Sequence, residues 1–202
     1  LRLGWNWPKK KVSVLKIHKK ILSVDFDYFD QAEMYSQMPK NIKAVLGDKS
    51  SPKRMLSLLG WQLLAENLPD SRMLSGVEFG DKGKPFIPNS NIWFNISNTR
   101  GIVVLAIHNQ PVGIDVERLR KPREVLYKRV FCSEEINSIC SPEDFTNLWT
   151  RKEAVVKLFG GGISMGLNSF SVIHDEVKAF GKQIKIEPVL IDGFFSHTAV
   201  YL

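Results

Sequence analysis

The sequence is poor in the residues and patterns that mark several common classes of protein. It contains only 2 cysteines and 4 histidines among 202 residues, and the histidines are too dispersed for a zinc site. Its longest unbroken apolar run covers residues 102–107, far short of the roughly 20 residues that a membrane-spanning helix needs. We therefore expect no disulfide framework, no zinc centre and no membrane span, but a cytoplasmic protein in which Cys132 and Cys140 are reduced.

Acidic residues are also in short supply. The chain has 21 Asp and Glu against 28 Lys and Arg, which gives a formal net charge of +7. Such an excess predicts an acidic partner, whether nucleic acid, a phosphate-rich ligand or an acidic protein. Part of it lies in residues 1–16, which contain no acidic residue and which we interpret as a flexible arm.

Capping residues, turn residues and apolar periodicity divide the chain into helices and strands. The predicted helices cover residues 29–38, 52–67, 121–131, 134–140 and 142–159. The predicted strands cover residues 76–79, 92–96, 102–108, 110–117, 170–173, 184–191 and 194–202, with a further strand inside 12–26. This mixture predicts an α+β fold, and a boundary near residue 113 would divide it into halves of residues 1–112 and 113–202.

The strand over residues 110–117 carries two carboxylates on one face. Because side chains on a strand repeat every two residues, Asp115 and Glu117 lie opposite the apolar face of Val112, Ile114 and Val116. Their carboxylates can converge on one cation, and oxygen ligands without His or Cys favour Mg²⁺. A polar strand face that simply meets solvent explains the pattern equally well.

The helix over residues 142–159 places a lysine inside its own apolar stripe. Lys152 falls among the apolar side chains, where a lysine is costly unless an anion or another partner meets it. Glu153 and Lys157 lie at the edge of the stripe, one turn apart. An ordinary i,i+4 ion pair on a solvated helix face accounts for these two residues but not for Lys152.

Two further segments could hold a phosphate. Ser97, Asn98 and Thr99 follow a predicted strand as a small polar turn, and such turns can bind phosphate or sugar. The Gly-Lys-Pro turn at residues 83–85 could present Lys84 to an anion. Each segment alone is equally compatible with an ordinary turn.

Together these four motifs closely resemble the 4′-phosphopantetheinyl transferases of the larger, pseudodimeric class. The resemblance covers most of the chain after about residue 38 and includes the G-K-P turn, the F-N-I-S stretch at 94–97 and the G-I-D-V-E strand at 113–117. It also includes the W-x-x-K-E-A-x-x-K helix at 149–157 and the glycines that follow it. What it implies is two similar α/β halves that form a pseudodimer, with coenzyme A in the cleft between them.

The resemblance also implies residue roles. The Mg²⁺ ligands would be Asp115, Glu117 and Glu153, and Glu153 would also take the proton from the serine of the carrier protein. The residues that would contact coenzyme A are Lys152 and Lys157 at the pyrophosphate, Lys84 and Pro85 at the nucleotide, and Ser97, Asn98, Thr99, Lys40, Lys43 and Arg54 at the 3′-phosphate. Asn98 departs from the family, which usually has histidine there.

The implied reaction is Mg²⁺-dependent transfer of 4′-phosphopantetheine from coenzyme A to a serine of an apo acyl or peptidyl carrier protein, with release of 3′,5′-ADP. Two alternatives are an inactive relative that binds coenzyme A or a carrier, and a basic nucleic-acid-binding module. A basic cluster lies at Arg118, Arg120, Lys121, Arg123, Lys128 and Arg129. Because no recognition helix or aromatic RNA-binding motif accompanies it, we expect it to dock an acidic carrier, and we expect a monomer without a nucleic-acid partner.

Overall fold

The structure is a computed structural model of the chain that describes residues 15–21, 29–47, 51–121, 124–162 and 165–202. Residues 1–14 of the predicted arm lie outside the described residues, whereas Lys16 already belongs to the first strand. Within the described ranges, no helix is long and apolar enough to cross a membrane.

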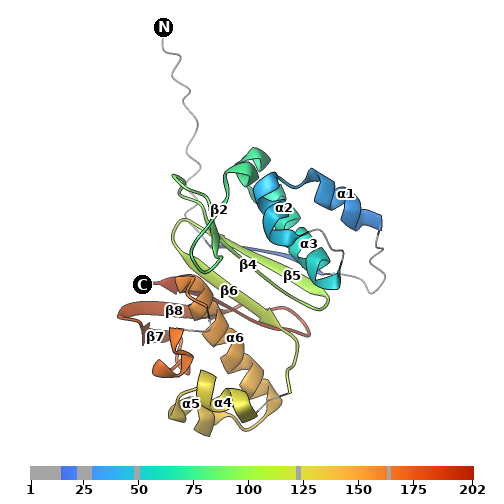
Figure 1. Cartoon of the computed structure of the whole chain (residues 1–202). Coiled ribbons are helices and arrows are strands. Elements are labelled where there is room, and N and C mark those ends of the chain that lie inside the picture. Colours follow the sequence, from blue (N-terminus) through green and yellow to red (C-terminus); the bar gives the residue numbers. More distant parts are fainter. Residues whose placement is uncertain (1–14, 22–28, 48–50, 122–123, 163–164) are drawn as a thin grey trace.

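Two antiparallel sheets form the centre of the molecule (Figure 1). The first has the strand order β1-β5-β4, made of β1 (Lys16–Ile21), β5 (Ile102–His108) and β4 (Trp93–Thr99). The second has the order β6-β9-β8-β7, made of β6 (Val112–Glu117), β9 (Phe195–Tyr201), β8 (Lys182–Pro188) and β7 (Glu176–Ala179). A short ribbon pairs β2 (Glu78–Phe79) with β3 (Pro85–Phe86).

The alternation of side chains along β5 explains how the layers stack. Val103, Leu105 and Ile107 pack with the helix α3 (Pro52–Asn67), beside α1 (Phe29–Gln37), α2 (Lys40–Leu46) and the 3-10 helix η1 (Ser71–Gly76). The intervening side chains of β5 pack against the apolar face of β6, namely Ile102, Val104 and Ala106 against Val112, Ile114 and Val116. The predicted division of β6 into an apolar and a polar face is therefore confirmed.

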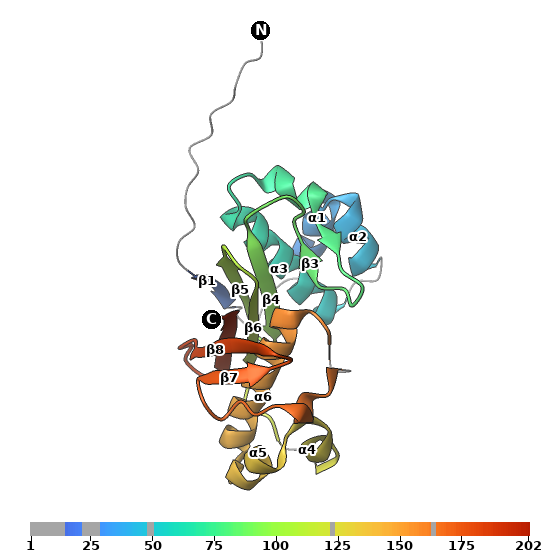
Figure 2. The same cartoon turned by 90° about the vertical axis from the view of Figure 1, so that its left-hand side faces the viewer.

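The other face of β6 meets α6 (Pro142–Phe159) at very short range. A Cβ atom on Gly113 would lie 2.0 Å from the carbonyl oxygen of Ala154 and 2.5 Å from the backbone nitrogen of Leu158. Only glycine permits this approach, which brings Asp115 on β6 next to the polar edge of α6. Beside the lower end of α6 lie α4 (Glu124–Val130) and α5 (Ser133–Ser138), as Figure 2 shows. The 3-10 helix η3 (Leu167–Ser169) packs next to α4.

The two sheets are joined along β4 and β6 by side chains. Asn95 of β4 accepts a hydrogen bond from the backbone nitrogen of Ile114 at 2.8 Å through its Oδ1 atom, and the next two side chains on the same face of β4 continue the contact. The strand that carries the carboxylates is thereby held between the first sheet and α6.

Most predicted elements are confirmed, and the α+β class with them. Ser51 and Ser141 cap α3 and α6 as expected, and α6 ends at Gly160 in the left-handed region, with φ 73°. Two predictions were wrong, because residues 170–173 form no strand and residues 76–79 are strand only at Glu78–Phe79. The sequence reading also missed α2, β3, β7 and the 3-10 helices η1 and η3. Cys132 and Cys140 are both free, the first half-buried and the second exposed.

Candidate active site

The carboxylates of β6 are held by hydroxyl groups of β4. Ser97 Oγ donates a hydrogen bond to Asp115 Oδ1 at 2.8 Å, and Thr99 Oγ1 donates to Glu117 Oε2 at 3.1 Å. Ser97 and Thr99 therefore belong to a strand, not to the polar turn that the sequence predicted, and the turn follows at residues 100–101. Their hydroxyls orient carboxylates instead of standing free for a phosphate.

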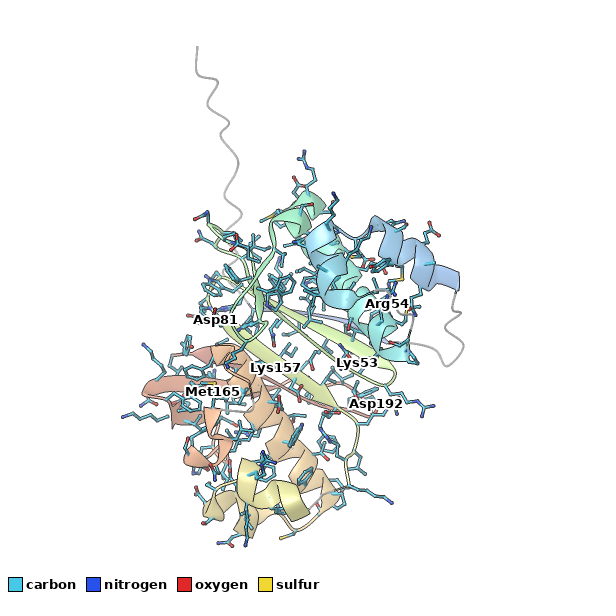
Figure 3. The ribbon with its side chains drawn as sticks, viewed as in Figure 1. Lys53, Arg54, Asp81, Lys157, Met165 and Asp192 are labelled. Carbon is cyan, nitrogen blue, oxygen red and sulfur yellow. The ribbon has the colours of Figure 1, made fainter. Side chains whose placement is uncertain are left out.

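The helix α6 adds Lys157 and a third carboxylate, that of Glu153, beside the carboxylates of Asp115 and Glu117. Lys157 Nζ donates to Asp115 Oδ1 at 2.5 Å and to Ser97 Oγ at 2.8 Å. Lys157 lies near the middle of the molecule, beside β6 (Figure 3). The other oxygen of Asp115, Oδ2, is buried and finds no hydrogen-bond partner among the described residues.

These groups line one cavity of about 330 Å³. Its lining residues are Ile96, Ser97, Asn98, Asp115, Glu117, Trp149, Glu153 and Lys157. Burial raises the pKa of Glu153, and the neighbouring negative charge of Asp115 raises it further. Burial also raises the pKa of Glu117, although the positive charge of Arg120 opposes that shift. The raised values make both carboxylates better proton acceptors than a solvated glutamate.

Arg120 borders this cavity, because it contacts two of the lining residues, Glu117 and Trp149. One Nη atom of Arg120 donates to Glu117 Oε1 at 2.8 Å, and its guanidinium lies 4.5 Å from the centre of the Trp149 ring. Arg120, predicted as a member of the basic docking cluster, therefore already has an acidic partner within the chain, and docking by that cluster stays a prediction. Arg118 is also engaged, because its Nε donates to the carbonyl of Arg100 at 2.7 Å. Arg123 lies outside the described residues.

The remaining members of that cluster, Lys121, Lys128 and Arg129, are exposed. The ion pair of Glu117 and Arg120 had one signal in the sequence, their separation by three residues. The strand β6 ends at Glu117, however, and the sequence does not predict the path of the chain beyond it.

The donor set fits a divalent cation. Three carboxylates line the cavity, one of them with an unpartnered oxygen, and hard oxygen ligands suit Mg²⁺. In the part of the chain that the structure describes, however, no three acidic, histidine or cysteine side chains stand close enough for a ready-made metal centre. Asp115, Glu117 and Glu153 would have to move together around the ion.

Lys152 does not reach the cavity, and its predicted contact with a phosphate is corrected. Its side chain is 0% exposed, and Nζ lies 2.9 Å from Glu135 Oε2. Nζ also donates to the carbonyls of Leu167 and Phe170. Burial lowers the pKa of Lys152, opposed by the hydrogen bond and charge of Glu135. The partner that a lysine in an apolar stripe requires is thus a buried glutamate on α5.

Lys84 joins the β2–β3 ribbon to α6. Its Nζ donates to the carbonyls of Val112 at 3.0 Å and Leu158 at 2.9 Å, and burial lowers its pKa to about 8. Pro85 begins β3 and is half-buried. Neither residue lines the carboxylate cavity, so their predicted contact with the nucleotide stays a prediction.

The three basic residues near the first helices also lie apart from the cavity. Lys40 is exposed, and Lys43 Nζ donates to the carbonyl of Ser36 at 2.7 Å. Arg54 lies higher in the molecule, on α3 (Figure 3), buried with its guanidinium 3.9 Å from the Tyr35 ring centre. The structure therefore does not bring Lys40, Lys43 and Arg54 together with Asn98, which does line the cavity.

An α+β fold with a cavity of three carboxylates and one lysine defines a site suited to a phosphorylated ligand and a cation. Comparison with known proteins is consistent with this class: residues 111–198 match the model of the 4′-phosphopantetheinyl transferase superfamily. A 4′-phosphopantetheinyl transferase AcpT of Escherichia coli (strain K12) is 31% identical over 145 residues, which cover 66% of this chain and 72% of that protein. The chain belongs to the 4′-phosphopantetheinyl transferase superfamily.

Two further relatives are similar over different shares of their length. A 4′-phosphopantetheinyl transferase of Bacillus subtilis is 36% identical over 107 residues, or 48% of each chain. The 4′-phosphopantetheinyl transferase gsp of Aneurinibacillus migulanus is 31% identical over 164 residues, or 78% of this chain and 65% of that protein. The chain thus spans about half to two thirds of the length of these two relatives.

Proposed function

We propose that this protein transfers the 4′-phosphopantetheine group of coenzyme A to a serine of an apo acyl or peptidyl carrier protein and releases 3′,5′-ADP, as a holo-[carrier-protein] synthase. The observation that carries the proposal is the convergence of Asp115, Glu117, Glu153 and Lys157 on one cavity. Phosphoryl-type transfer needs charge neutralisation and positioning more than a covalent nucleophile, and these side chains supply both.

Each residue has a role that follows from its position. Asp115, Glu117 and Glu153 would hold Mg²⁺, which when bound neutralises the diphosphate and stabilises the leaving group. Glu153 also accepts the proton of the attacking serine hydroxyl, a task that its raised pKa favours. Lys157 offers its ammonium to a phosphoryl oxygen, and Asn98 lines the cavity from β4.

The wider arrangement belongs to the same proposal. The two layers of helix and sheet would be the similar halves of a pseudodimer, with coenzyme A in the cleft between them. The carrier would be acidic and would approach a monomeric enzyme over the exposed Lys121, Lys128 and Arg129. An excess of positive charge accelerates the encounter with such a partner, and salt screens it over about 10 Å at 0.1 M.

The test is incubation with coenzyme A, Mg²⁺ and an apo carrier protein, followed by mass spectrometry of the carrier. We expect the carrier to gain the mass of one phosphopantetheine group, and chelation of Mg²⁺ by EDTA should abolish the gain. Glu153→Gln should lower the rate by a factor of roughly 10²–10⁴, the usual contribution of a general base.

The matched control is Glu143→Gln, which makes the same change at an exposed position in the first turn of α6. It should retain the wild-type rate. An unmodified carrier would contradict the proposed activity, and near-wild-type turnover of Glu153→Gln would contradict the role of Glu153 while leaving the activity in place.

A further inference from the structure

The two carboxylates of β6 each have a cation of the chain beside them. Asp115 Oδ1 lies 2.5 Å from Lys157 Nζ, and Glu117 Oε1 lies 2.8 Å from an Arg120 nitrogen. The two positive charges occupy the positions where a divalent cation would neutralise the same oxygens. Two of the three carboxylates that line the cavity are thus already paired with a cation of the chain.

The two cations differ in how firmly they are held. Arg120 is stacked against Trp149, at 4.5 Å from the ring centre. Lys157 has a flexible four-carbon stem, its side chain is 28% exposed, and its ammonium has no ring against it among the described residues. A lysine ammonium rotates its donors freely, whereas a stacked guanidinium has a fixed plane. Lys157 is thus the cation that can leave.

The burial of Asp115 explains why its carboxylate needs a positive charge beside it. Its side chain is 5% exposed, and a carboxylate so deeply buried is costly without a positive charge nearby. Oδ1 is satisfied by Lys157 and Ser97, while Oδ2 has no partner among the described residues. A metal ion could reach Oδ2, but Lys157 would still compete for Oδ1, and its positive charge would repel the ion.

We propose that Lys157 is a stand-in cation, which occupies Asp115 in the ligand-free protein and passes to a phosphoryl oxygen when a diphosphate enters the cavity. The inference rests on the proposed function and adds an order to it: a divalent cation binds weakly until a phosphorylated ligand draws Lys157 away. A lysine that served only to pair permanently with Asp115 would not couple the two binding events.

The test is Mn²⁺ binding to the ligand-free protein, measured by electron paramagnetic resonance of the free ion. Lys157→Met removes both the competitor for Asp115 and a positive charge that repels the ion, so the Kd for Mn²⁺ should fall at least fivefold, a modest coupling for two sites that share a residue. Lys157→Gln, which keeps hydrogen-bonding groups at the end of the side chain, should cause a smaller fall and serves if Lys157→Met does not fold.

The matched control is Lys185→Met on β8. Lys185 is half exposed, is paired with Glu187 at 2.7 Å and does not line the cavity, so its loss makes the same change in net charge away from the site. It should change the Kd for Mn²⁺ by less than twofold. A second measurement on the unmodified protein compares Mn²⁺ binding without and with coenzyme A, which should strengthen it.

An unchanged or higher Kd in both folded Lys157 variants would overturn the inference, and the proposed transfer activity would be untouched. Absence of Mn²⁺ binding in every protein, even with coenzyme A present, would instead contradict the metal site of the proposed function. Circular dichroism melts establish that each variant is folded before its affinity is compared.

Discussion

Replacement of Gly113 by alanine should disrupt the contact that builds the site. The new Cβ atom would stand 2.0 Å from the carbonyl oxygen of Ala154 and 2.5 Å from the nitrogen of Leu158, whereas an ordinary contact is 3.4–4 Å. Both clashing atoms are backbone, so no side-chain rotation relieves them. Strand β6 and helix α6 would have to separate by roughly an ångström or more.

The size of the effect follows from that displacement. Overpacking of a core costs about 1–3 kcal/mol when side chains can adjust, and we expect Gly113→Ala to reach about 3 kcal/mol because they cannot. For a domain of this size, 1 kcal/mol corresponds to roughly 2–4 °C in Tm. The variant should therefore melt about 6–12 °C below the wild type, and the separation of Asp115 from Lys157 should lower transfer activity in the fraction that folds.

Urea and thermal unfolding measure the loss, with Gly76→Ala as the control. A Cβ atom on Gly76 meets nothing within 4 Å, so that variant should stay within about 0.5 kcal/mol of the wild type. If Gly113→Ala were as stable as Gly76→Ala, the close approach of β6 and α6 would not be what requires glycine, and the reasoning would fail.

Three further outcomes are expected. Burial lowers the pKa of His197 to about 4, below its value near 6.5 in the unfolded chain. The stability that neutral His197 contributes is therefore present above pH 6.5 and lost as the pH falls towards 4. In urea unfolding with EDTA present, the free energy of unfolding of the wild type relative to His197→Gln should fall by about 2–3 kcal/mol between these pH values. Lys152→Met leaves Glu135 buried without a counter-ion and should cost about 3–5 kcal/mol in urea, while the exposed Lys53→Met should cost under about 0.5 kcal/mol. Asn98→His should tighten coenzyme A relative to its analogue without the 3′-phosphate in calorimetry, since histidine can carry positive charge; an equal change for both ligands would show that Asn98 does not face that phosphate.

Local sequence patterns predicted the elements that carry the site. The period-two alternation of Val112, Ile114 and Val116 gave the correct face for Asp115, because successive side chains of a strand point to opposite faces and the apolar set packs against β5. Serine caps and following prolines likewise fixed the start of α3 and α6. These features depend on neighbours in the chain, which a single sequence displays.

The errors concern contacts between segments distant in the chain. Ser97 and Thr99 looked like a phosphate-binding turn because hydroxyl residues are common there, yet β4 extends through both and directs them to β6. Residues 170–173 have the composition of a strand but are held as a loop, where Arg151 Nε donates to the carbonyl of Val172. Hydrogen bonds between side chains and distant segments produce no periodic pattern in the sequence, so a single sequence does not reveal them.

Lys152 and Lys157 show most clearly what a single helix cannot reveal. Both stand on α6, and the sequence assigned both to the pyrophosphate, but Lys152 lies on the side that meets α5 and the 3-10 helix η3. There a single glutamate, Glu135, also accepts the backbone hydrogen bonds of Cys132 and Val172, so the ion pair ties α5 and the loop after η3 to α6. Lys157 lies on the side that meets β6, where its partner is Asp115, one of the three proposed ligands of a metal ion. The chemistry of a lysine is the same in both places, and the two residues differ in whether the ammonium is buried against a glutamate or opens onto the cavity.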